Sequence, residues 1–251
     1  MQSERRLRGL SWLLERGPRM ILETHPDLRL RKLTIGAERA PLLVIDNFIA
    51  APERLVRKAA GRQFTVPSRF YPGIRAEAPP SYRQLIETRL KDVLFAHFGL
   101  QGRSLRFSMS HYSLVTTPPE ELAAIQRIPH VDSLNGSGLA TIHYLFKADL
   151  GGTAFYRHRK TGFEYVDEVR ADTYFRSLES ENDGPDMPVA EYINGNTALF
   201  ERIASEDGVF NRMLVYRRNS LHSGCIAKGF VPDPNPLTGR LSVNCFIDAV
   251  G

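Results

Sequence analysis

The feature that most limits the fold of this chain is a series of short β-type segments in its second half. Residues 105–115 alternate apolar and polar side chains, and further runs rich in β-forming residues follow at 139–146, 151–158, 196–203 and 209–216. Parallel strands need a long crossover between them, which is usually a helix. Strands at such close intervals without intervening helices therefore predict an antiparallel sandwich or barrel.

The first hundred residues are expected to support this core. Residues 1–40 read as a helical lead-in followed by a short strand, and 41–49 form an apolar run typical of a buried strand. A proline opens the segment 52–61 and a glycine closes it, as in a short helix. Residues 62–80 are rich in Pro, Gly and aromatics and are expected to be irregular. Apolar side chains at helical spacing predict one long helix over 81–98 that covers a face of the sheet.

Length and composition favour one domain over the whole chain. A chain of 251 residues with 42% hydrophobic content can bury one sizeable core. We expect a lead-in over 1–40, a strand and supporting helices over 41–100, and the β core over 101–251. Residues 160–195 interrupt that core with a long, aromatic, loop-rich insertion, which we expect to cover a functional site.

Charge and cysteine content limit the partners and the compartment. Lys and Arg outnumber Asp and Glu by 33 to 28, and no basic block with interleaved aromatics is present, so we expect no nucleic-acid partner. Two cysteines, Cys225 and Cys245, are too few for a disulfide framework and predict reduced thiols in the cytoplasm. No stretch has the length of a membrane span, and the N-terminal apolar run is too short for a signal peptide, so we expect no membrane partner. The sequence does not define an oligomeric state.

The strongest chemical signal is the tripeptide His130-Val131-Asp132. On a strand, His130 and Asp132 would point to the same face while Val131 packs behind them. A second histidine, His222, follows on a later predicted strand. Two histidines and one carboxylate on one face can bind a metal and leave coordination positions open for oxygen and a cosubstrate. Alone, the tripeptide is common and is more often a surface His–Asp pair.

In the order of its motifs, the chain resembles the iron(II)- and 2-oxoglutarate-dependent dioxygenases, in particular the prolyl-hydroxylase-like branch. The resemblance covers roughly residues 42–250 and rests on the following segments: Val44–Phe48, His130–Asp132, Gly151–Phe155, His222–Cys225 and Gly239–Arg240. We expect a bacterial family of this fold whose substrate is not assigned.

The resemblance implies a mainly β fold with flanking helices, built on a double-stranded β-helix (jelly-roll or cupin-like) core. It implies iron(II) bound by His130, Asp132 and His222. Because a smaller residue in place of Asp132 would open a position for halide, its carboxylate favours hydroxylation. The substrate is expected to be a small molecule or a peptide side chain.

The resemblance also implies 2-oxoglutarate as cosubstrate. Its far carboxylate would contact Arg240, with Ser242, Tyr144 and Tyr112 as further cosubstrate-binding candidates. Many prolyl hydroxylases have Lys where this chain has Arg240, and a proline-rich turn separates Arg240 from His222.

Two other functions remain open, together with other candidate ligands. The same core without activity would be a binding protein, and the same triad with zinc would be a hydrolase that activates water. His111, His143 and His158 compete as ligands. If Tyr144 faces the site, His143 faces away from it.

Overall fold

The computed structural model describes residues 20–67, 70–181 and 184–251. The helical part of the predicted lead-in falls within residues 1–19, outside the described residues. In chain order, the elements are β1 (Arg29–Ile35), β2 (Ala40–Asp46), α2 (Glu53–Ala60), β3 (Gly73–Glu77), α3 (Pro80–Arg89), α4 (Lys91–Phe98), β4 (Ser104–Val115), the 3-10 turns η1 (Pro119–Glu121) and η2 (Ala124–Gln126), β5 (Leu139–Tyr144), β6 (Gly152–His158), α5 (Ala171–Glu181), β7 (Phe200–Glu206), β8 (Met213–Arg217), β9 (His222–Cys225) and β10 (Leu241–Val250).

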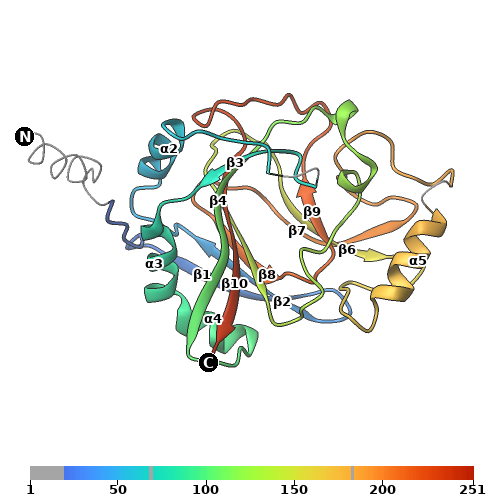
Figure 1. Cartoon of the computed structure of the whole chain (residues 1–251), viewed down its shortest axis with the longest axis horizontal. Helices are drawn as coiled ribbons and strands as arrows, with labels where there is room; N and C mark the ends of the chain where they lie inside the picture. Colours follow the sequence, from blue (N-terminus) through green and yellow to red (C-terminus); the bar gives the residue numbers. More distant parts are fainter. Residues whose placement is uncertain (1–19, 68–69, 182–183) are drawn as a thin grey trace, which may run out of the picture.

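The strands form two sheets, as Figure 1 shows. The seven-stranded sheet has the order β1-β2-β8-β5-β10-β4-β3, and the three-stranded sheet has the order β7-β6-β9. All their pairings are antiparallel. Phe155 of β6 packs with Leu214 and Tyr216 of β8 in an apolar interior between the sheets. The molecule is therefore mainly antiparallel β with flanking helices, in the double-stranded β-helix arrangement that the resemblance implies.

The connection between β7 and β8 differs from the expected hairpin. β7 pairs with β6 in the small sheet, whereas β8 pairs with β2 and β5 in the large sheet. The turn at 206–208 therefore carries the chain from one sheet to the other. A turn signal shows that the chain reverses, but it does not show which strands then pair.

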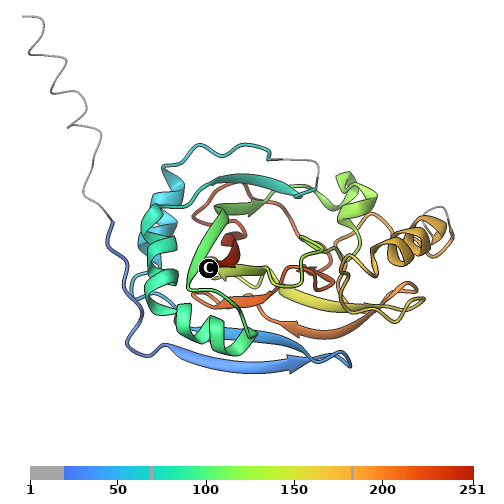
Figure 2. The same cartoon turned by 60° about the horizontal axis from the view of Figure 1, so that its bottom comes forward.

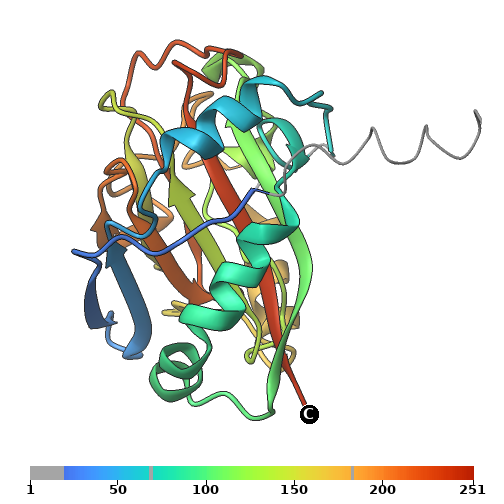
Figure 3. The same ribbon diagram turned by 90° about the vertical axis from the view of Figure 1, so that its left-hand side faces the viewer.

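Helices cover the outer face of the large sheet. Figure 3 shows α2, α3 and α4 in front of it, and their buried side chains share one core cluster with Val243, Cys245 and Ile247 of β10. The single helix predicted over 81–98 is two helices, which meet at Leu90, where φ widens to −114° with ψ −13°. Leu90 is itself buried in this cluster, so the break turns both helices onto the sheet.

The insertion at 160–195 contains α5, a helix that the loop-rich sequence did not predict. Figures 1 and 2 place α5 at the end of the molecule opposite the helices α2–α4. Tyr174 of α5 is buried against His158, with ring centroids 5.2 Å apart. The insertion is therefore packed onto the small sheet.

None of the helices in the described part of the chain combines the length and hydrophobicity needed to cross a lipid bilayer.

Candidate metal centre

The three predicted metal ligands come together between the two sheets. His222 is the first residue of β9, and His130 and Asp132 lie on the irregular segment before β5. The N–H of His130 donates to the carbonyl of His222 at 2.9 Å, and the N–H of His222 donates back at 3.0 Å. The N–H of Asp132 donates to the carbonyl of Arg218 at 2.8 Å. Backbone hydrogen bonds thus hold both segments at the site, although the strand predicted for 130–132 is reduced to one isolated bridge at His130.

The ligand atoms have a spacing that one metal ion can bridge. Nε2 of His130 lies 3.7 Å from Oδ1 of Asp132, and Nε2 of His222 lies 3.5 Å from its Oδ2. One ligand atom from each residue lies within 4.8 Å of the other two. Ligands bound at about 2.0–2.2 Å on one face of a metal are roughly 3 Å apart, so only a small contraction is needed.

Contacts around the histidines favour the metal-binding form of each ring. Nδ1 of His222 lies 2.9 Å from the carbonyl of Ser220, so this nitrogen carries the proton and leaves the Nε2 lone pair facing Asp132. The rings of Tyr216 and Phe155 pack on His222 with centroids 4.7 and 6.5 Å away. Desolvation by the surrounding protein atoms, and then the neighbouring His222, lower the pKa of His130, although 46% of its side chain is exposed. A neutral imidazole is the form that coordinates metals.

The triad opens into a cavity of about 500 Å³. Side chains from both sheets, from residues 125–132 and from α5 line it. This volume lies in the range of small-molecule sites. The insertion at 160–195 contributes Tyr174, Phe175 and Leu178 of α5 to the wall.

Arg240 and Ser242 line the same cavity as the triad. The Arg240 side chain is buried, and the residue is only 3% exposed. Its Nε donates to the carbonyl of Leu150 at 2.9 Å, and its Nη2 donates to that of Gly152 at 2.8 Å. A guanidinium has five N–H donors, so three have no partner among the described residues and can serve a ligand. Arg240 is therefore a fixed cation with free donors inside the cavity.

The two tyrosine candidates lie on opposite faces of the large sheet. Tyr144 faces the interior, where its hydroxyl lies 2.7 Å from Oγ1 of Thr153, a residue of the cavity wall. Burial raises the pKa of Tyr144 to about 12, so the hydroxyl stays neutral. Tyr112 packs under the helices on the other face. Tyr112 therefore does not line the cavity, because alternation along β4 turns its neighbour Ser113 to the inner face.

The competing histidines lie elsewhere. His143 faces the helix layer, as its position next to Tyr144 predicts, and stacks on Tyr82 with centroids 5.9 Å apart. His158 is buried, with Nε2 2.9 Å from Oε2 of Glu181. His111 lines a separate hollow of about 290 Å³ beside β3.

Sequence reasoning missed one charged residue of the cavity wall, Arg75. It lies on β3, within the segment 62–80 that was expected to be irregular. The alternation Ile74-Arg75-Ala76-Glu77, closed off by Pro79, was the available signal for a short edge strand.

The sequence model of a family of unknown function, DUF6445, matches residues 26–247. No curated protein matches the chain.

Three of the solved structures that are similar to this chain are the following. The 2-oxoglutarate-dependent epimerase SnoN from nogalamycin biosynthesis is 14% identical, with 84% of this chain and 79% of that chain covered and a TM-score of 0.49. HygX from Streptomyces hygroscopicus, with nickel and 2-oxoglutarate bound, is 12% identical, with 84% of each chain covered and a TM-score of 0.49. EctD from S. alaskensis with bound iron is 14% identical, with 89% of this chain and 84% of that chain covered and a TM-score of 0.43.

Proposed function

This chain belongs to the DUF6445 family, and we propose that it is a non-haem iron(II)- and 2-oxoglutarate-dependent oxygenase that hydroxylates an organic substrate. One observation carries the proposal: His130, Asp132 and His222 converge in a cavity that also contains the buried cation Arg240. The triad alone would equally suit a zinc hydrolase. A buried arginine with free donors in the same cavity favours a carboxylate-bearing cosubstrate.

The residues of the triad fit iron(II). Two imidazole nitrogens and one carboxylate oxygen on one face are typical of non-haem iron(II) oxygenases and leave positions for a 2-oxo acid and for oxygen. Bound there, the iron would supply the activation of oxygen. The bond from His222 Nδ1 to the carbonyl of Ser220 orients its ring, and the backbone bond of Asp132 holds its carboxylate opposite both histidines.

Arg240 binds the distal carboxylate of 2-oxoglutarate in this proposal. Its two bonds to backbone carbonyls fix the guanidinium before the ligand arrives, which reduces the entropy lost on binding. Ser242 lies two residues further along on the same face and offers a hydroxyl beside it. The overall reaction is balanced when one atom of O2 enters the substrate C–H bond and the other enters succinate, with release of CO2. 2-Oxoglutarate and the C–H bond each lose two electrons.

The test measures metal content, then oxygen-dependent CO2 release from carboxyl-labelled 2-oxoglutarate. Wild type should bind one iron(II) per chain and release CO2 slowly even without substrate. The double variant His130→Ala, His222→Ala should lose both properties. His25→Ala, a histidine on the N-terminal segment, serves as the control and should keep both.

Unchanged metal content in the double variant would contradict the triad. Metal binding without any 2-oxoglutarate binding would contradict the oxygenase and favour a zinc hydrolase or an inactive binding protein.

A further inference from the structure

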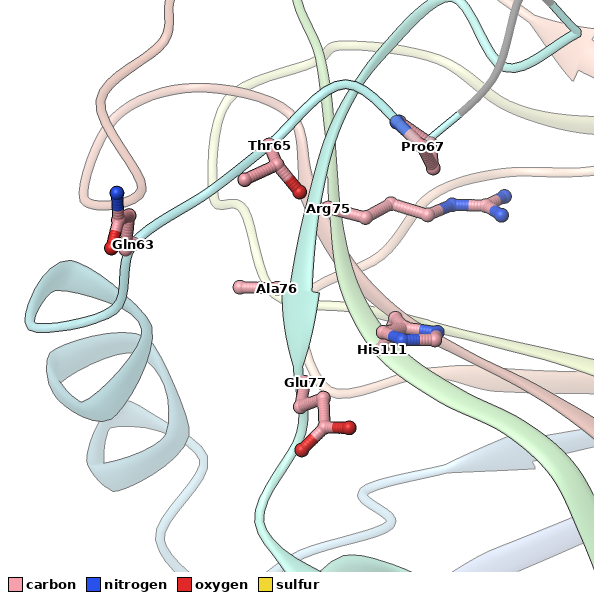
Figure 4. A pocket seen from close by; sticks show the side chains of 7 residues that line it. All are labelled: Gln63, Thr65, Pro67, Arg75, Ala76, Glu77 and His111. Carbon is pink, nitrogen blue, oxygen red and sulfur yellow. The ribbon is translucent and has the colours of Figure 1, made fainter.

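A second arginine, Arg75, enters the cavity from the edge strand β3. Arg75 lies opposite Ser113 of β4, which in turn lies opposite Ser242 of β10. All three residues therefore point to the inner face of the sheet. Figure 4 shows the side chains of Arg75 and His111 extending to the same side of β3, where Arg75 also borders the smaller hollow.

The Arg75 guanidinium has weak partners for a group so little exposed. Its Cζ lies 4.0 Å from the centre of the Tyr71 ring, and its Nη1 lies 3.4 Å from Sδ of Met109, a weak acceptor. Its Nε is buried and has no hydrogen-bond partner among the described residues. Within the same part of the chain, no carboxylate oxygen lies within 4.0 Å of it.

The other part-buried arginines among the described residues each have a carboxylate or a backbone carbonyl as partner, although Nε of Arg218 is also buried without one. The partners are Glu164 for Arg157, Glu38 for Arg170, Asp46 for Arg212, Asp248 for Arg218, and backbone carbonyls for Arg127, Arg217 and Arg240. Leaving a buried N–H of a charged group unpaired costs free energy. Desolvation lowers the pKa of Arg75 from its usual value, although the charges of Tyr71 and of the Asp132 carboxylate, which lies beyond 4.0 Å, act in the opposite direction. Such a cation in a ligand cavity is suited to receive an anion from the ligand.

The geometry favours a carboxylate. With Nη1 directed at Met109, one face of the group stacked on Tyr71 and Nε buried, Nη2 is the amino group left for a ligand in the cavity. A charged N–H donor of this kind forms a strong hydrogen bond with a carboxylate oxygen.

Apolar residues mark where the remainder of that ligand would lie. Phe70, Ile125 and Phe175 line the same cavity and are 62%, 40% and 47% exposed, respectively. Large exposed apolar side chains that line one cavity indicate a binding surface.

We propose that Arg75 binds a carboxylate of the substrate, and that the substrate is an organic acid whose apolar part lies against Phe70, Ile125 and Phe175. The identification of this acid as the substrate rests on the proposed oxygenase function. The binding of the carboxylate by Arg75 does not.

The experiment compares two acids with their uncharged amides: octanoate with octanamide, and 4-phenylbutanoate with 4-phenylbutanamide. Each is titrated by calorimetry at pH 7 without oxygen into the iron(II)-loaded protein, with and without 2-oxoglutarate. We expect wild type to bind at least one acid about tenfold or more tighter than its amide. Arg75→Leu should abolish this preference, and Arg75→Lys should retain part of it. Arg106→Leu, a largely exposed arginine of the neighbouring strand, is the matched control and should behave as wild type.

A wild type without preference for either acid would overturn the proposal, as would a preference that survives in a folded Arg75→Leu variant. The titration of 2-oxoglutarate tests the remaining possibility, that Arg75 binds the cosubstrate. If Arg75→Leu weakens 2-oxoglutarate binding as much as Arg240→Leu does, Arg75 serves the cosubstrate and the proposal is wrong. If wild type binds the acids through Arg75 but binds no 2-oxoglutarate, the oxygenase function fails and the role of Arg75 stands.

Discussion

Arg240 and Arg75 line one cavity, but the protein holds them in different ways. Arg240 is fixed by the carbonyls of Leu150 and Gly152, next to the start of β6. Arg75 stacks on Tyr71, and its buried Nε–H has no partner in the described part of the chain. An arginine with two protein acceptors is already oriented for a ligand that every turnover uses. An arginine without protein acceptors depends on the ligand to complete its hydrogen bonds. This suits a role in selecting the substrate.

The first residue-scale prediction concerns Arg240→Leu. The metal ligands stay intact, so metal should still bind, while 2-oxoglutarate loses a charged contact of about 1.5–3 kcal/mol and should bind roughly tenfold to a hundredfold more weakly. Arg240→Lys should lose less, because a point charge still pairs without the bidentate geometry. Anaerobic titration of 2-oxoglutarate into the metal-loaded protein measures the effect.

Thermal unfolding provides the control for this prediction. Removing Arg240 leaves the buried carbonyl of Gly152 without this donor, so Arg240→Leu should also lose about 1–3 kcal/mol of stability. If the folded Leu variant binds 2-oxoglutarate as tightly as wild type, Arg240 is not the anchor.

At the scale of elements, the insertion at 160–195 connects the small sheet to the cavity. Tyr174 packs against His158 on β6, while Phe175 and Leu178, on the same helix, line the cavity. Tyr192, near the end of the insertion, also lines the cavity and donates its hydroxyl proton to the carbonyl of Thr117 at 2.7 Å. The insertion is thus joined to the segment that leads into the metal ligands.

We therefore predict that ligands order this insertion. Adding metal and 2-oxoglutarate should slow tryptic cleavage after Arg170 and Arg176, because α5 forms part of the wall around the filled cavity. Mass spectrometry of the fragments over time measures the rates. Cleavage after Arg29, on the remote edge strand β1, should keep its rate. Protection at β1 without protection in α5 would count against the insertion as a cover.

At the scale of the whole molecule, the buried residue His143, under the helices on the large sheet, makes the free energy of unfolding depend on pH. His143 lies between Tyr82 and Phe48, and its Nε2 is 3.1 Å from Oδ1 of Asn211. Burial lowers the pKa of His143 to about 4, against about 6.5 in an unfolded chain. Between these two values the unfolded state binds more protons than the native state, so stability falls as the pH falls.

Metal-free wild type should thus lose about 2 kcal/mol more stability than His143→Gln between pH 7 and pH 5. Urea unfolding at both pH values measures it. The comparison cancels the other titrating groups, His130 included, because both proteins contain them. Equal losses in the two proteins would show that His143 does not stay neutral in the folded state.

Local patterns in the sequence determined much of this architecture. Period-two alternation identified the strand around 105–115, because side chains on a strand alternate between two faces, and a run of β-forming residues identified the strand around 139–146. The pattern His130-x-Asp132, with His222 later in the chain, predicted three ligands that the structure brings together, since imidazole and carboxylate groups at this spacing are suited to one metal. The neighbouring positions of His143 and Tyr144 were enough to assign them to opposite faces.

Other features depended on contacts between distant segments. Tyr112 was a secondary candidate for the cosubstrate site, but it packs under the helices. Which face of β4 the helices cover depends on the pairing of β4 with β10. The chain passes from the small sheet to the large sheet between β7 and β8 because each strand pairs with a different partner. A turn sequence does not show which strands will pair. β3 is too short and too close to prolines to be stable alone, so it exists because β4 offers an open edge. Arg75 reaches the metal cavity through that pairing, because backbone hydrogen bonds between residues far apart in sequence set both its register and its direction.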